Sequence, residues 1–189
     1  MIEQSPAQPI QRSASGGVGA EDPAWARLGR WDPVFELPNV AIHTQVLPNG
    51  QVLFWGRRDR PTDSLNEHEC TPYIWDPRTG ELSPTPQPTL ADGTKVNLFC
   101  AGHAFLPDGR LLVAGGHIVD GDGLDQACVY DYRTNTWTAL PVMNQGRWYP
   151  TATTLADGTV LVLSGSFIRN GATIINDLPQ IWDGQQWLP

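Results

Sequence analysis

Three stretches of the chain share one pattern of apolar and polar positions. Each has an apolar strand, a two-residue Asn-Gly or Asp-Gly turn, and a second apolar strand that ends in glycine. They span residues 43–56, 103–116 and 153–165. Asn-Gly and Asp-Gly accept the positive φ that a two-residue hairpin turn requires. The pattern therefore predicts three antiparallel hairpins.

Each hairpin is followed by a third strand, and two of them also by an outer strand that begins with Trp. These further strands are predicted at residues 73–77, 129–132, 180–184, 137–141 and 187–189. From Gly50 to Gly109 is 59 residues, and from Gly109 to Gly158 is 49. Four strands at a period of about 50 residues are typical of the kelch β-propeller blade.

The predicted fold class is all-β: a partial kelch-like propeller of three four-stranded antiparallel blades, with an orphan N-terminal outer strand at residues 29–38. A closed ring uses about 4–8 blades. We therefore interpret the chain as a fragment of a longer protein, with a ring completed by several copies as the alternative. The first 28 residues are rich in Pro, Gly, Ser and Gln and are predicted to be a flexible arm. Residues 29–189 are predicted to form the incomplete propeller domain.

The composition supports a β-fold and excludes two classes of protein. Eight Trp, 19 Gly and 17 Pro favour turns and packed strands over helices. The formal net charge of −8 offers no basic patch for phosphates, which excludes a nucleic-acid partner. No apolar run approaches the ~20 residues of a membrane span. No secretory signal is visible in the first 28 residues, so the localisation stays open.

Two reactive residues occupy the same position in adjacent repeats. Cys100 precedes Gly109 by nine residues and Tyr149 precedes Gly158 by nine, so both stand just before the innermost strand of a blade. Side chains in one strand register point alike, which predicts that the sulfur and the phenol meet near the propeller axis. The equivalent residue of the first repeat is Ala41, which is too small to interfere.

The residues around this pair resemble two motifs of the copper-radical oxidases, the family of galactose oxidase and glyoxal oxidase. Phe99-Cys100-Ala101-Gly102 is similar to the motif that carries the family's cross-linking cysteine. Residues 146–151, Gly-Arg-Trp-Tyr-Pro-Thr, are similar to the segment that carries the cross-linked tyrosine. The resemblance spans residues 40–189.

This resemblance implies a cofactor and a reaction. Cys100 and Tyr149 would form a thioether radical cofactor, with Tyr149 also an equatorial copper ligand. The implied reaction oxidises primary alcohols, aldehydes or sugars with O2 and yields H2O2. Trp148 and Phe167 are candidate cofactor-binding residues, Phe167 because it follows Gly165-Ser166, where galactose oxidase carries a shielding tryptophan. From the residues alone, Arg147 is expected at a blade edge and Trp148 in ordinary packing.

The sequence departs from the family in its histidines. The family's other ligands, an axial tyrosine next to a histidine and a later second histidine, lie further along its chain. All four histidines of this sequence precede Tyr149. Imidazole is a principal copper ligand, so we expect this chain alone to be inactive as an oxidase. His103 and His117 are expected at loop or rim positions, and the acidic loop 120–125 is expected to be a solvated turn rather than a calcium site.

Two other functions stay open. A non-catalytic kelch propeller would bind protein or carbohydrate through its loops, because one fold serves many functions. A decayed oxidase would keep the motifs but leave Cys100 reduced and unlinked. A lone Cys before a strand is most often a small buried apolar residue, so the oxidase hypothesis depends on the pairing of Cys100 with Tyr149.

Overall fold

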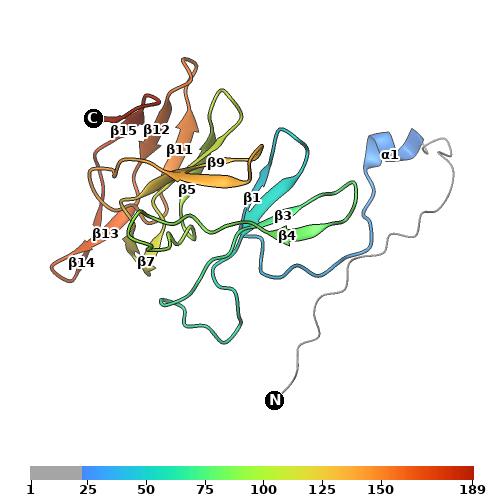
Figure 1. Ribbon diagram of the computed structural model, residues 1–189, viewed down its shortest axis with the longest axis horizontal. Coiled ribbons are helices and arrows are strands. Elements are labelled where there is room, and N and C mark those ends of the chain that lie inside the picture. Colours follow the sequence, from blue (N-terminus) through green and yellow to red (C-terminus); the bar gives the residue numbers. More distant parts are fainter. Residues whose placement is uncertain (1–22) are drawn as a thin grey trace.

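The computed structural model describes residues 23–189, and antiparallel sheets dominate it (Figure 1). Three of these sheets have four strands each, which confirms the prediction of three four-stranded blades. Within the described range, no helix has the length and apolar character that a membrane span requires.

Each blade is a meander in which consecutive long strands are neighbours. The first blade contains β1 (His43–Val46), β2 (Val52–Trp55), β3 (Tyr73–Trp75) and β4 (Leu82–Pro84). The second contains β5 (Gly102–Phe105), β6 (Leu111–Ala114), β9 (Ala127–Asp131) and β10 (Thr136–Ala139). The third contains β11 (Thr151–Thr154), β12 (Val160–Leu163), β15 (Gln180–Trp182) and β16 (Trp187–Leu188).

Two short ribbons interrupt the second and third blades between their second and third long strands. They are β7 (His117–Val119) with β8 (Asp122–Gly123), and β13 (Ser166–Arg169) with β14 (Ala172–Ile175). The sequence analysis did not predict these ribbons. The acidic loop at 120–125, expected to be a solvated turn, in fact contributes β8. Asp122 there accepts a hydrogen bond from the backbone N–H of Ile168 at 2.8 Å, so the loop joins two neighbouring blades.

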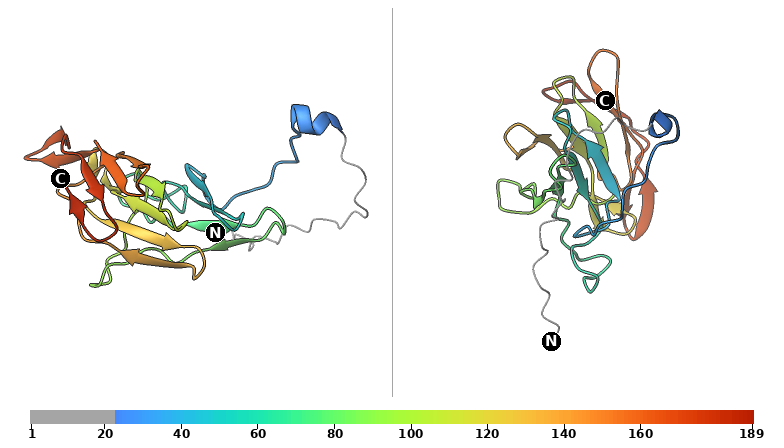
Figure 2. Two further views of the ribbon diagram at one scale, coloured as in Figure 1. Left: turned by 90° about the horizontal axis from the view of Figure 1, so that it is seen from above. Right: turned by 90° about the vertical axis from the view of Figure 1, so that its right-hand side faces the viewer.

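The segment before the first blade differs from the prediction in two ways. Residues 1–22 of the predicted arm lie outside the described residues, but its last part forms a short helix, α1 (Pro23–Leu28), which stands apart from the blades (Figure 2). Residues 29–38, predicted as an orphan outer strand, form no strand because no described strand pairs with them. Trp31 is 99% exposed, whereas Phe35 packs on Trp75 of β3 with ring centroids 5.1 Å apart.

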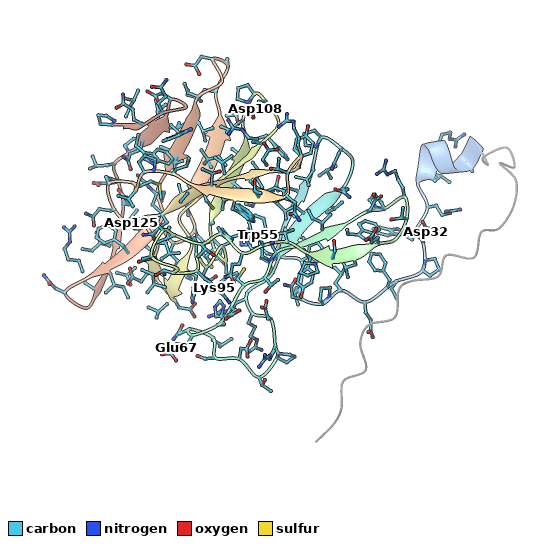
Figure 3. The ribbon with its side chains drawn as sticks, viewed as in Figure 1. Asp32, Trp55, Glu67, Lys95, Asp108 and Asp125 are labelled. Atoms are coloured by element: carbon cyan, nitrogen blue, oxygen red, sulfur yellow. The ribbon has the colours of Figure 1, made fainter. Side chains whose placement is uncertain are left out.

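The core lies between the blades, and the strand pattern of β6 shows why. All four residues of β6 are buried because this strand has a blade on each side. Leu111 and Val113 pack toward the first blade, in a cluster that includes Trp55 (Figure 3), while Leu112 and Ala114 pack with Val160 and Val162 of the third. In β12 the burial alternates, since only one of its faces is covered by a described blade. Alternate side chains of one strand thus bind two neighbours together.

The hairpin turns add a repeated contact between blades. Gly109 has a φ of +85°, and a Cβ added there would lie 2.8 Å from the ring of Pro48 in the turn before it. The same relation recurs one blade later, between Gly158 and Pro107. Glycine at these turns therefore serves both the backbone conformation and the approach of the neighbouring blade.

A matched pair of substitutions separates these two roles. Gly50 occupies the same turn position in the first blade, with a φ of +83° and open space where a Cβ would be. Gly50→Ala is expected to lower the free energy of unfolding by about 1–2 kcal/mol through the backbone alone. Gly109→Ala should lower it by roughly 1–3 kcal/mol more, because the methyl group also overlaps Pro48. Equal losses in chemical denaturation would contradict this account of blade packing.

Candidate functional site

Cys100 and Tyr149 meet across the boundary between the second and third blades. The backbone N–H of Tyr149 donates to the carbonyl of Cys100 at 2.8 Å. Their side chains also lie close enough to affect each other, since the phenol lowers the pKa of the thiol and the thiol raises the pKa of the phenol. The structure thus brings together the two residues that the repeat register placed in equivalent positions.

Both residues adopt a backbone conformation that side chains usually avoid. The φ angles are +63° for Cys100 and +56° for Tyr149, in the left-handed region. A non-glycine residue held there costs of order 1–3 kcal/mol, and such residues cluster at functional sites. A glycine at either position would relieve this cost. Keeping a thiol and a phenol here therefore lowers the free energy of unfolding.

The two side chains differ in exposure but share a protonation state. Cys100 is fully buried, and burial raises the pKa of its thiol to about 12. Tyr149 is 52% exposed, and burial of the remainder, followed by its hydrogen bond with Cys100, raises the pKa of its phenol to about 12. At neutral pH the pair is therefore a protonated thiol beside a protonated phenol, with one face of the phenol open to solvent.

Two aromatic rings flank Tyr149. The Trp148 ring lies 4.7 Å from it at 72°, and the Phe99 ring lies 6.3 Å from it at 73°, both edge-to-face. The indole of Trp148 also lies close enough to Cys100 to lower the pKa of that thiol, although its buried N–H makes no hydrogen bond within the described residues. Trp148 therefore contacts both members of the pair. The sequence analysis named Trp148 as a candidate, but it treated Phe99 only as part of a motif.

Phe167 lies next to this group without stacking on the phenol. Trp148 and Ser166 exchange backbone hydrogen bonds of 2.8 and 2.9 Å, which places Phe167 one residue away from that bridge. Phe167 is buried, and the guanidinium of Arg169 lies 5.1 Å from the centre of its ring. Among the aromatic pairs of residues 23–189, none joins Phe167 to Tyr149.

Arg147 is fully buried, so the expectation of a blade-edge arginine was wrong. Its guanidinium donates to the backbone carbonyls of Ser164 at 2.7 Å and Leu178 at 2.6 Å, and to the side chain of Asn144 at 3.1 Å. Burial lowers its pKa to about 10, so it stays charged at neutral pH. Within the described part of the chain it pairs with no carboxylate. Its charge is instead solvated by these neutral oxygens, which join the Tyr149 segment to the loops around β13–β15.

A close backbone approach explains how the Tyr149 segment is held from the other side. Gly123 of β8 lies so near the peptide bond between Arg147 and Trp148 that any Cβ would overlap it. Arg147 also donates its backbone N–H to the carbonyl of Leu124 at 3.0 Å. The β7–β8 ribbon therefore supports the segment directly, a role that only the tertiary structure reveals.

The four histidines surround the Phe99-Cys100 segment. His43, His68 and His117 contact the Phe99 ring with centroids 5.6–6.1 Å apart, and His103 lies 5.5 Å from His43. His117 is only 3% exposed and His103 is half-buried, so neither occupies the expected rim position. In the described part of the chain, no three His, Cys, Asp or Glu side chains are grouped as a metal site. The pair therefore has one direct candidate copper ligand, the phenol of Tyr149.

Comparison with known proteins finds a kelch motif in the chain and two oxidases among its relatives. Residues 105–144 match the kelch motif. The chain is 32% identical over 152 residues to galactose oxidase of Gibberella zeae. This match covers 76% of this chain and 21% of that protein. It is 28% identical over 159 residues to the aldehyde oxidase GLOX of Vitis pseudoreticulata, covering 80% of this chain and 27% of that one. The chain thus spans a minor part of the length of these relatives.

A solved structure supports the fold. It is described as a novel fungal alcohol oxidase with catalytic diversity among the AA5 family, in complex with copper. It superposes with a TM-score of 0.66 at 22% identity, over 84% of this chain and 32% of the other. The likeness confirms the propeller architecture of the blades.

The role of Arg147 can be tested by a conservative replacement. Lysine keeps the charge but lacks the planar fork that reaches several oxygens at once. Arg147→Lys should therefore leave buried carbonyls without donors and lower the free energy of unfolding by about 2–3 kcal/mol. The control is Arg110→Lys, since Arg110 is exposed and pairs only with Asp108 in its own turn; its cost should stay below about 1 kcal/mol. Similar losses for both variants, measured by urea denaturation, would show that Arg147 is not a structural anchor.

Proposed function

The chain belongs to the family of kelch-type propellers that includes galactose oxidase and glyoxal oxidase, and from this we propose that it carries the cofactor-forming part of a copper-radical oxidase. The proposed reaction oxidises a primary alcohol, a sugar or an aldehyde, with O2 as the acceptor and H2O2 as the product. The observation that carries the proposal is the contact between Cys100 and Tyr149 from adjacent blades, both in the left-handed region.

The cofactor precursor needs only these two side chains and an oxidant. A thioether bond between the sulfur of Cys100 and a ring carbon of Tyr149 removes the thiol hydrogen and one ring hydrogen. The two protons and two electrons so released pass to O2, which the proposed reaction already uses, and give H2O2. Because forming this bond releases two electrons, the pair does not couple until such an oxidant acts on it.

Copper fits one part of this site. The side chain of Tyr149 is half-exposed, so a metal can reach its phenol oxygen. Copper bound there would supply one-electron redox chemistry and activate O2. No three His, Cys, Asp or Glu side chains are grouped as a metal site among residues 23–189, and on this proposal the remaining copper ligands come from outside this range. On this proposal these residues alone bind copper weakly and do not turn over substrate.

The neighbouring residues protect and orient the pair. Trp148 and Phe99 flank the Tyr149 ring, and these edge-to-face contacts limit the access of solvent to it. Trp148 is therefore the primary cofactor-contacting residue on this proposal. Phe167 acts beside it, through the backbone bridge of Trp148 with Ser166. Arg147 holds the whole segment in place through the carbonyls of Ser164 and Leu178.

Replacing Tyr149 by Phe tests the proposal. In the natural gene product loaded with copper, Tyr149→Phe should reduce H2O2 formation from primary alcohols and aldehydes to background, since it removes the phenol oxygen. The free energy of unfolding should change by less than about 0.5 kcal/mol because the side chain is half-exposed. Tyr132 lies in the turn between β9 and β10, with the guanidinium of Arg133 4.6 Å from the centre of its ring. Tyr132→Phe removes a phenol oxygen outside the proposed site, so it is the matched control and should keep full activity.

Two outcomes would contradict the oxidase function. One is undiminished peroxide formation by Tyr149→Phe. The other is a wild-type natural protein that forms no peroxide with copper and the whole substrate panel, which would instead favour a propeller that binds protein or carbohydrate.

A further inference from the structure

A chain of three side chains leads from the first blade to the backbone of Cys100. The N–H of Cys100 donates to Nε2 of His43 in β1 at 3.1 Å. Nδ1 of His43 lies 3.3 Å from Nε2 of His103 in β5, and Nδ1 of His103 lies 2.7 Å from the terminal amide of Gln45 in β1. The contacts alternate between the first and second blades and end at the backbone N–H of Cys100, which the oxidase proposal makes part of the cofactor.

Proton counting fixes the direction of every bond in this chain. Nε2 of His43 accepts from a backbone N–H, so it carries no proton, and the proton of a neutral His43 must be on Nδ1. That N–H donates to Nε2 of His103, which leaves the proton of His103 on its own Nδ1. Nδ1–H of His103 then needs an acceptor, and the amide group nearest to it is that of Gln45, whose Nε2 lies 2.7 Å away. A half-turn of the amide exchanges its nitrogen and oxygen, which supplies the acceptor and leaves the shape of the side chain unchanged.

Both histidines must be neutral for this arrangement to hold. Burial, and then the neighbouring His103, lower the pKa of His43 to about 4, and burial also lowers the pKa of His103. A protonated His43 would place an N–H against the N–H of Cys100. At neutral pH the chain is therefore uncharged and has one consistent set of donors.

The ring of His43 is itself fixed by its surroundings. It stacks on the indole of Trp55 with centroids 5.2 Å apart and planes 15° apart. The indole N–H of Trp55 donates to the carbonyl of Leu98 at 2.9 Å, two residues before Cys100. The first blade thus holds the Cys100 segment at two points, through Leu98 and through Cys100 itself.

We infer that His43, backed by His103 and Gln45, is a positioning residue that sets Cys100 for bond formation with Tyr149. The left-handed φ of Cys100 helps to determine where its Cβ points. The N–H of Cys100 is anchored by His43, and its carbonyl accepts the N–H of Tyr149. With both peptide groups held by different blades, the Cα–Cβ bond of Cys100 has one direction relative to the phenol, and only rotation about that bond moves the sulfur. This inference rests on the proposed oxidase function.

The tautomers give a test that does not depend on copper or activity. In two-bond 1H–15N NMR spectra, His43 and His103 should both show the Nδ1–H form, which is the less common tautomer of neutral histidine. The signals of His43 should not change between pH 6 and pH 8, a range that lies well above its pKa of about 4. An Nε2–H signal for His43 would overturn the inference, because Nε2 would then be unable to accept from Cys100.

Variants of His43 test whether the chain positions the sulfur. The readout is the rate at which Cys100 and Tyr149 become linked when copper is added to the natural gene product prepared without it. His43→Phe keeps the stacked ring but leaves the Cys100 N–H without its acceptor, so linkage should slow by about tenfold. His43→Gln places an amide oxygen where Nε2 was and should restore most of the rate. His68→Phe is the matched control, since His68 also contacts Phe99 but does not bond to Cys100, and its rate should be that of the wild type.

The outcomes separate this inference from the proposed function. If the wild type and His43→Phe link equally fast, the positioning role is wrong and the oxidase proposal stands. If His43→Phe and His43→Gln are equally slow, the hydrogen bond is not the cause and the inference also fails. If the wild type forms no link at all, the proposed function fails and the positioning role fails with it.

Discussion

The conformation of Cys100 depends on hydrogen bonds from both neighbouring blades. His43 of the first blade accepts its N–H, and the N–H of Tyr149 at the edge of the third blade donates to its carbonyl. A residue other than glycine keeps a left-handed φ only where the surrounding structure holds it there. The packing of three blades is thus also what brings the thiol to the phenol, and neither blade alone would suffice.

That packing rests on a few features that act together. The fully buried strand β6 joins the two cores, with Leu111 and Val113 on one side and Leu112 and Ala114 on the other. The charge of Arg147 is solvated by backbone carbonyls that belong to the loops of the third blade. Removing one partner of such a hydrogen bond leaves a buried polar group unpaired. The free-energy cost of the unpaired group exceeds the net stabilisation that the hydrogen bond contributes. The segments that carry the candidate site are therefore held by contacts from all three blades.

The sequence predicted what local chemistry and repetition control. The Asn-Gly and Asp-Gly turns located the hairpins, and counting back from their glycines was enough to place Cys100 and Tyr149 together. The burial of Arg147 and the β7–β8 ribbon were not predictable in this way, because both depend on contacts between distant segments. Residues 29–38 have the pattern of an outer strand, but a strand forms only where a partner offers its hydrogen bonds. The hydrogen-bond chain through His43 and His103 carries no motif, so only the fold reveals it.

The central claim is that Cys100 and Tyr149 are the two halves of one cofactor. Tandem mass spectrometry of proteolytic peptides from the copper-loaded natural protein tests it most directly. The account predicts a single species in which the Cys100 and Tyr149 peptides are joined, lighter by two hydrogen atoms than their sum and resistant to thiol reductants. Separate peptides, with Cys100 free to react with an alkylating agent after denaturation, would contradict it.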